Sequence, residues 1–196
     1  MAVRHIPWIS PDEFLDQEAL SETKHTYFAG LVTAMIGGTY EHGRIAGNLL
    51  GGLFAALRGR GCGVAGSDVM FQTGSKEMYT YPDVMVICGA VAKVASRSTV
   101  VTNPIFLAEV LSPSTEGMDR WAKSHEYRAS PTVRQFALIS QDKALIELHT
   151  RHEDGTWRVS EVSGLTGDCE FTSLDCKVPM ALLYEGVLGA DGLSSS

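Results

Sequence analysis

The stretch YPDVMVI at residues 81–87 decides the fold, together with the run IFLAEVL at residues 105–111. Both runs are short, apolar and rich in branched side chains, which is typical of buried strands. Each carries one carboxylate, since Asp83 precedes the first strand and Glu109 lies inside the second. Burying a carboxylate is costly unless a cation or several hydrogen-bond donors accompany it. These two acids are therefore the first candidates for a functional site.

Outward from these strands, the hydrophobic pattern predicts further helices and strands. Apolar residues spaced three and four apart between residues 45 and 57 indicate the clearest amphipathic helix. Ser10-Pro11-Asp12-Glu13 has the form of a helix start, and Ala29-Gly30 that of a hairpin turn. The remaining predictions are strands at 64–73, 136–139, 144–149 and 157–162, a turn at Asp154-Gly155, a helix at 119–129, and a loop or short helix at 90–103. This order predicts an α/β fold of the mixed α+β kind rather than a doubly wound sheet.

Length and composition predict a globular chain with a substantial core, because 44% of the 196 residues are apolar. We expect a single domain over residues 1–188 and a loose C-terminal tail over 189–196. No run reaches the roughly 18 apolar residues that span a membrane, and the N-terminus lacks a signal-peptide pattern. The predicted location is therefore cytoplasmic, with no membrane partner. A net charge of −7 argues against a protein that coats nucleic acid, yet allows an enzyme acting on phosphodiesters at one metal site.

The cysteines and serines favour neither a disulfide framework nor a serine nucleophile. No CxxC pair is present, and we expect all four cysteines to be reduced thiols: Cys62, Cys88, Cys169 and Cys176. Ser112 and Ser114 lack the GxSxG context of a nucleophilic serine, and their sequence suits a turn. No GxxxxGK[ST] loop indicates a nucleoside triphosphate site.

Asp83 and Glu109 form the strongest pair of candidates for chemistry. If their strands are neighbours, the carboxylates converge and can share a hard cation, Mg²⁺ or Mn²⁺. Such an ion activates water and polarises a phosphoryl oxygen, and Lys123 on the next helix would stabilise the developing charge. Three more residues are candidates for supporting roles: His42, Asp68 and Arg120. The alternatives remain structural, with Glu109 at a solvated edge-strand position, His42 in an ordinary first helical turn and Asp68 facing outward from a strand.

An ordered set of motifs along the chain resembles the Uma-two-type endonuclease family of the PD-(D/E)XK superfamily. The set is Tyr81-Pro82-Asp83-Val84, then EVLSPST at 109–115, then Asp119-Arg120 with Lys123 and Tyr127. The likeness extends to Glu41-His42 with the following helix, to Gly66-Ser67-Asp68 and to LYEGV at 183–187. It covers roughly residues 10 to 188. The resemblance implies a restriction-endonuclease-like core, a mixed sheet flanked by helices.

The resemblance also implies a function and a site. Asp83 and Glu109 would be the metal-binding acids of an Mg²⁺-dependent endonuclease that hydrolyses DNA phosphodiester bonds, and Asp83, Glu109 and Lys123 would be its catalytic set. The superfamily's usual lysine position is Leu111 here, so the lysine would come from the next helix. DNA is the implied substrate, and a homodimer is expected because many restriction-type nucleases pair two subunits.

One part of the sequence departs from the family pattern. Thr26, Ala29 and Leu31 stand where the family has acids in its first hairpin, and the first of those acids joins the active site. Losing an anionic ligand weakens Mg²⁺ binding. The second hypothesis is therefore a catalytically degenerate member that retains the fold and acts as a binding or interaction protein.

Overall fold

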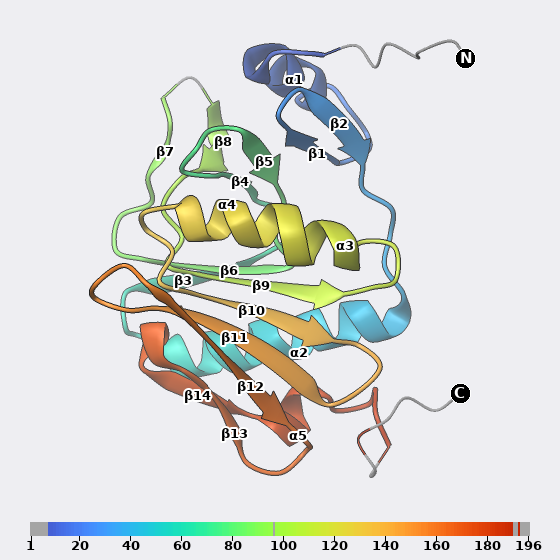
Figure 1. Ribbon diagram of the computed structural model, residues 1–196, viewed down its shortest axis with the longest axis vertical. Helices are drawn as coiled ribbons and strands as arrows, with labels where there is room; N and C mark the ends of the chain where they lie inside the picture. Colours follow the sequence, from blue (N-terminus) through green and yellow to red (C-terminus); the bar gives the residue numbers. More distant parts are fainter. Residues whose placement is uncertain (1–7, 96, 190–191, 193–196) are drawn as a thin grey trace.

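The computed structural model describes residues 8–95, 97–189 and 192, with elements labelled along the chain in Figure 1. The helices are α1 (Pro11–Glu18), α2 (Tyr40–Leu57), α3 (Glu116–Met118), the π-helical turn η1 (Asp119–Lys123), α4 (Ser124–Ala129), the 3₁₀ turn η2 (Thr172–Leu174) and α5 (Met180–Leu183). The strands of the first half are β1 (His25–Phe28), β2 (Leu31–Ala34), β3 (Cys62–Gly66), β4 (Met70–Gln72), β5 (Met78–Thr80), β6 (Val84–Cys88), β7 (Lys93–Val94) and β8 (Arg97–Val101). Those of the second half are β9 (Phe106–Leu111), β10 (Gln135–Ser140), β11 (Leu145–Arg151), β12 (Trp157–Ser163), β13 (Asp168–Phe171) and β14 (Cys176–Pro179).

The strands form two six-stranded sheets and one small ribbon. The larger sheet has the order β12-β11-β10-β9-β6-β3, the smaller one β2-β1-β5-β4-β8-β7, and β13 pairs with β14. In the larger sheet β9 and β10 run parallel while the other neighbours are antiparallel. A parallel pair needs a crossover, and the helical segment α3–η1–α4 supplies it. The predicted mixed α+β class with helices flanking a mixed sheet is confirmed.

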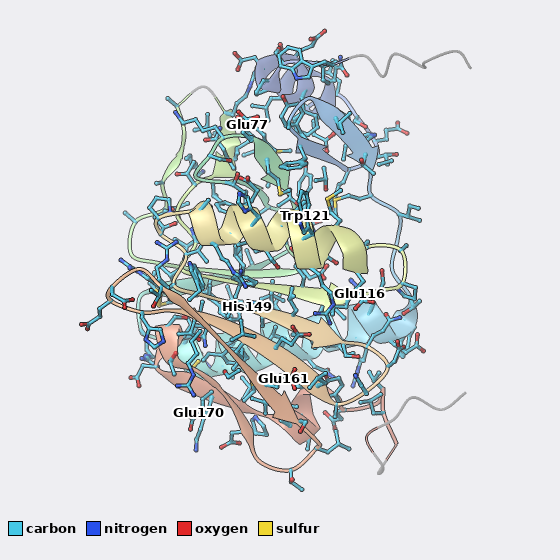
Figure 2. The ribbon with its side chains drawn as sticks, viewed as in Figure 1. Glu77, Glu116, Trp121, His149, Glu161 and Glu170 are labelled. Carbon is cyan, nitrogen blue, oxygen red and sulfur yellow. A yellow bond between two sulfur atoms is a disulfide. The ribbon has the colours of Figure 1, made fainter. Side chains whose placement is uncertain are left out.

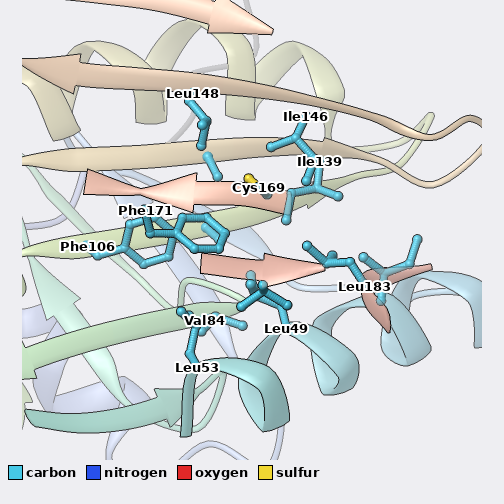
Figure 3. Close-up of a cluster of buried hydrophobic side chains, with 14 of the residues drawn as sticks. Leu49, Leu53, Val84, Phe106, Ile139, Ile146, Leu148, Cys169, Phe171 and Leu183 are labelled. Atoms are coloured by element: carbon cyan, nitrogen blue, oxygen red, sulfur yellow. The ribbon is translucent and has the colours of Figure 1, made fainter. Parts of the chain in front are cut away.

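The larger sheet has a hydrophobic core on each face, because successive side chains of a strand point to opposite sides. In β9, Phe106 and Val110 pack with α2, whereas Leu107 and Leu111 pack on the side of α4. The helix α2 contributes one stripe of fully buried side chains: Ile45, Leu49, Leu53 and Leu57. Figure 3 shows Leu49 and Leu53 directed at this sheet. Glu109 stands with Leu107 and Leu111 in strand parity, so it belongs to the α4 side.

Several local predictions are confirmed by the backbone. Ser10 caps α1 by accepting a hydrogen bond of 3.3 Å from the Glu13 N–H, with Pro11 at the first helical position. Ala29 and Gly30 both have positive φ, of 48° and 91°, as the two-residue hairpin between β1 and β2 requires. The long amphipathic helix is present as α2.

Two local predictions are wrong. Residues 90–103 hold the strands β7 and β8 instead of a loop or short helix, because Val100 and Val101 are buried against β4. The single strand expected at 64–73 is two strands, β3 and β4, which join different sheets. The helix expected at 119–129 is present as η1 and α4, with the short α3 before it, and its first turn is π-helical.

The prediction of four reduced cysteines is also wrong. Cys62 and Cys88 are opposed across the antiparallel pair β3–β6 and form a disulfide. Their separation of 26 residues conceals this contact in the sequence, because only the strand register brings them together. Cys169 and Cys176 are free thiols, as expected.

The C-terminal tail expected at 189–196 lies mostly outside the described residues, which include only Gly189 and Gly192 of it. The carbonyl of Gly192 accepts a hydrogen bond of 2.9 Å from the Ala144 N–H. Among the described residues, no helix combines the length and apolar character needed to cross a membrane.

His149 on β11 is a buried histidine on the α4 side of the larger sheet, labelled in Figure 2. Its ring stacks on Phe136 with centroids 4.2 Å apart, and Arg128 Nη2 lies 2.8 Å from Nδ1. Burial, and then the charge of Arg128, lowers the pKa of His149 to about 4. The imidazole is therefore neutral in the folded protein near neutral pH.

Acidification from about pH 6.5 to about pH 4 should lower the free energy of unfolding by about 1–2 kcal/mol through His149. In this range the unfolded chain binds a proton at His149 that the folded protein does not yet bind. The variant His149→Gln keeps an acceptor for Arg128 and cannot titrate. Urea unfolding at both pH values should show a smaller loss of unfolding free energy in this variant than in the wild type. Equal losses in the two proteins would contradict the role given to His149.

Candidate active site

Asp83 lies at the start of β6, where the chain passes from the smaller sheet to the larger one. Its Oδ2 accepts a hydrogen bond of 2.8 Å from the backbone N–H of Val110 in β9. The same oxygen lies 3.2 Å from Nε2 of His42. Since Val84 pairs with Ala108 in the antiparallel β6–β9 register, Asp83 and Glu109 are next to each other across these strands. The predicted convergence of the two acid-bearing strands is therefore present.

His42 reaches Asp83 from the first turn of α2. Thr39 caps this helix by accepting a hydrogen bond of 3.2 Å from the His42 N–H. The hydrogen bond with Asp83 raises the pKa of His42 above its ordinary value, although burial of the ring opposes this shift. The carboxylates of Glu109 and Asp119 act in the same direction as Asp83. His42 therefore belongs to the same electrostatic cluster as the two strand acids.

Glu109 lies in the middle of β9 and is only 2% exposed. Its Oε2 is 2.9 Å from Nζ of Lys123, and its Oε1 accepts a hydrogen bond from the hydroxyl of Tyr127. Burial raises the pKa of the Glu109 carboxyl, and the Lys123 ammonium opposes that shift. Both oxygens of this carboxylate thus have a donor from the helical segment, and the solvated edge-strand alternative does not apply.

Lys123 is 6% exposed and lies between two carboxylates. Besides Glu109, Oδ1 of Asp119 lies 2.8 Å from its Nζ. Burial alone would lower the pKa of Lys123, but these two carboxylates raise it above its ordinary value. The side chain is therefore an ammonium ion held inside the protein by ion pairs.

The cluster carries more negative than positive charge. Asp83, Glu109 and Asp119 provide three carboxylates, against the single ammonium of Lys123 and the imidazole of His42. A negative excess remains in either protonation state of His42, as long as the acids are ionised. An uncompensated negative centre in a buried site attracts a cation.

The donor chemistry of this cluster fits a magnesium-type ion. Asp83 and Glu109 offer hard carboxylate oxygens, which Mg²⁺ prefers, and each carboxylate has lone pairs beyond its present hydrogen bonds. In the part of the chain that the structure describes, no group of three His, Cys, Asp or Glu side chains is arranged around a common point. One or two carboxylates, with water and substrate phosphate completing the shell, are common for Mg²⁺.

Two of the predicted supporting residues lie outside this cluster. Asp68 is on the turn between β3 and β4, where its side chain is 93% exposed and pairs with Lys24. Arg120 is paired at 2.6 Å with both Glu116 and Glu147 and lines a neighbouring cavity of about 300 Å³. Neither side chain is brought to Asp83 or Glu109 by these contacts.

The three hairpin residues that depart from the family pattern have no carboxylate to offer the site. Thr26 on β1 is buried, with its Oγ1 3.5 Å from Oγ1 of Thr80. Ala29 lies in the hairpin turn, and Leu31 is an exposed residue of β2. A pair of hydroxyl groups therefore faces the interior where the resemblance implied a carboxylate.

The sequence interpretation missed two members of the cluster. Asp119 appeared only as part of a motif, although its position four residues before Lys123 is a signal for a helical ion pair. Tyr127 is likewise named only as part of that motif, whereas in the structure its hydroxyl donates to Glu109. Burial raises the pKa of this hydroxyl well above its ordinary value, so it remains a donor.

Comparisons with known proteins agree with this architecture. Residues 11–175 match the family model described as "Uma2: Putative restriction endonuclease". "Uncharacterized protein slr1290" of Synechocystis sp. is 32% identical over 92% of this chain and 94% of its own length. "Uncharacterized protein sll1609" of the same organism is 30% identical over 88% of this chain and 97% of its own length.

A solved structure shares the fold. It is described as a "putative nuclease belonging to DUF820" from Anabaena variabilis ATCC 29413, and it superimposes with a TM-score of 0.73 at 14% identity. The match covers 90% of this chain and 97% of the other. The predicted restriction-endonuclease-like core is confirmed.

Proposed function

The chain belongs to the Uma2 "putative restriction endonuclease" family, and on that premise we propose that it is a metal-dependent endonuclease that hydrolyses DNA phosphodiester bonds. The observation that carries the proposal is the buried cluster at the β6–β9 junction, in which Lys123 is ion-paired with Glu109 beside Asp83. Strongly buried acids with a specific charge partner are typical of functional sites. The superimposed structure, described as a "putative nuclease", supports the same class of activity by analogy of fold alone.

In this proposal Asp83 and Glu109 hold the ion, which is Mg²⁺ or Mn²⁺. When bound, such an ion polarises the scissile phosphate and makes water more acidic. Lys123 presents its ammonium to the negative charge that develops on phosphorus-bound oxygens in the transition state. His42, at the positive end of α2, keeps the Asp83 carboxylate oriented through the 3.2 Å contact with its Oδ2. Tyr127 orients Glu109 by donating to Oε1.

The DNA substrate and the assembly follow from the same proposal. Because the chain carries a net charge of −7, binding of a polyanion must depend on local cations at the site rather than on the surface as a whole. We propose a homodimer as the working assembly, since two sites are needed to cut both strands of a duplex in one event. The mass of the protein in solution tests this part directly.

The alternative is a degenerate member that keeps the fold and binds a partner without cleavage. The observation that favours it is the buried hydroxyl pair of Thr26 and Thr80, which replaces an acid implied by the family pattern. Loss of one anionic ligand weakens binding of a hard cation.

Calorimetric titration with Mg²⁺ and Mn²⁺, followed by plasmid cleavage, decides between the two functions. The variant Asp83→Asn is chosen because its amide oxygen can still accept from Val110 while the charge is lost. The matched control is Asp68→Asn, a change of the same kind at an exposed carboxylate. Ion binding and cleavage in the wild type and the control, with neither in Asp83→Asn, would support the nuclease. No binding at millimolar ion, with or without DNA, and no cleavage would contradict it and favour the degenerate member.

A further inference from the structure

The segment that carries Lys123 contains an uncommon turn. Residues Asp119–Lys123 form the π-helical turn η1, and the backbone N–H and the hydroxyl of Ser124 both donate to the carbonyl of Asp119. Single π-turns occur often at functional sites. This one turns Asp119 and Lys123 into the protein, while Trp121 between them is 76% exposed and projects from the segment in Figure 2.

Asp119 pairs only with Lys123 among the described side chains, whereas Glu109 also accepts a hydrogen bond from Tyr127. Its carboxylate is 2% exposed, and Oδ1 lies 2.8 Å from the Lys123 ammonium as an ion pair without hydrogen-bond geometry. Among the described residues this buried oxygen has no hydrogen-bond partner. Glu109, by contrast, divides its two oxygens between Lys123 and Tyr127. A buried carboxylate is costly without a partner, and the Lys123 ammonium is the cation that compensates the charge of Asp119.

A metal ion bound at the site would affect the carboxylates of Glu109 and Asp119 differently. Glu109 is a candidate metal ligand, and its negative charge is then shared with a divalent cation. A cation at Glu109 repels the Lys123 ammonium and weakens its ion pair with Glu109. Asp119 forms an ion pair with Lys123 and with no other described side chain, and it lies on the same helical segment, so it is placed to hold the ammonium in that state.

We propose that Asp119 is a positioning residue, which keeps the Lys123 ammonium at the site when the charge of Glu109 is neutralised. Its relevance to catalysis rests on the proposed nuclease function. The holding contact itself is a property of this chain and can be measured without metal, DNA or cleavage. The variant Glu109→Gln reproduces the neutralised state, because it removes the charge and keeps the size of the side chain.

Nitrogen NMR of the six lysine ammonium groups tests the proposal on the full chain. A buried, ion-paired ammonium gives a protected signal, unlike exposed lysines. We expect the Lys123 signal to persist in Glu109→Gln and to disappear in Glu109→Gln/Asp119→Asn. The matched control is Glu109→Gln/Glu116→Gln, which removes an exposed acid of the same helical segment and should keep the signal. Loss of the signal in Glu109→Gln alone, or its persistence in the Asp119 double variant, would overturn the proposal.

The experiment remains decisive if one variant fails to fold or if the nuclease proposal fails. Should the double variant not fold, loss of the Lys123 signal in the single Glu109→Gln protein would still overturn the proposal. Should the wild type bind no metal, the proposed function fails while the lysine signals continue to report on Asp119. In a protein that cleaves DNA, Asp119→Asn should lower kcat by about 100-fold through misplacement of Lys123, with KM for DNA unchanged. A rise in KM with kcat unchanged would contradict the positioning role.

Discussion

Replacing Lys123 by methionine is expected to lower the free energy of unfolding by about 3–5 kcal/mol near neutral pH. The replacement keeps most of the length of the side chain but leaves Glu109 and Asp119 buried without their shared cation. Breaking a buried ion pair from one side is more costly than removing both partners, because the remaining charge has lost its hydration and its partner. The variant should also lose cleavage of DNA in the proposed function.

The pH dependence identifies the cause of this loss. In Lys123→Met the unpaired carboxyls have raised pKa values, so they take up protons as the pH falls, and the deficit relative to the wild type shrinks. Urea unfolding at several pH values measures both effects. The double variant Lys123→Met/Glu109→Gln should recover part of the stability, since one of the two unpaired charges is gone. A loss below about 1 kcal/mol at neutral pH, independent of pH, would show that Lys123 is an exposed side chain.

Replacing Phe106 by alanine is expected to cost about 3–5 kcal/mol of unfolding free energy. Phe106 is fully buried on the α2 side of β9, and its ring meets Phe171 edge-on, with centroids 5.0 Å apart and planes at 72°. Figure 3 shows the two rings together in the core. The control Phe106→Leu retains most of the apolar volume and should cost about 1 kcal/mol. Equal effects of the two substitutions in denaturant unfolding would mean that no tight packing exists around this ring.

Much of the fold could be predicted from the sequence because its main elements are locally encoded. The spacing of apolar residues alone indicates the buried stripe of α2 and the buried strands β6 and β9. The strands β7 and β8 do not, because they are short, largely exposed on one side and held by pairing with a distant strand. The Cys62–Cys88 disulfide was missed for a related reason, since it depends on a register between strands that the local pattern cannot specify.

The candidate site could be predicted where a charged residue lies within or beside an apolar strand. Glu109 inside an apolar strand and Asp83 before one are two such residues. The structure places both with Lys123 in one cluster. Asp119 lies in a polar stretch where an acid is unremarkable, and only the π-turn reveals that it faces inward. Asp68 also stands out in the sequence, as an acid inside the strand predicted at 64–73. In the structure this position is an exposed turn, so the acid needs no special partner.

The hydrogen bond from Val110 to Asp83 gives this protein a built-in spectroscopic sensor. The Val110 amide is part of a buried strand, yet its acceptor is a carboxylate of the candidate site rather than a carbonyl of a neighbouring strand. The chemical shift of an amide proton depends strongly on the charge of its acceptor. Any event that changes the charge on Asp83, whether protonation or arrival of a cation, therefore has a reporter in the backbone itself, readable without a label, a substrate or turnover.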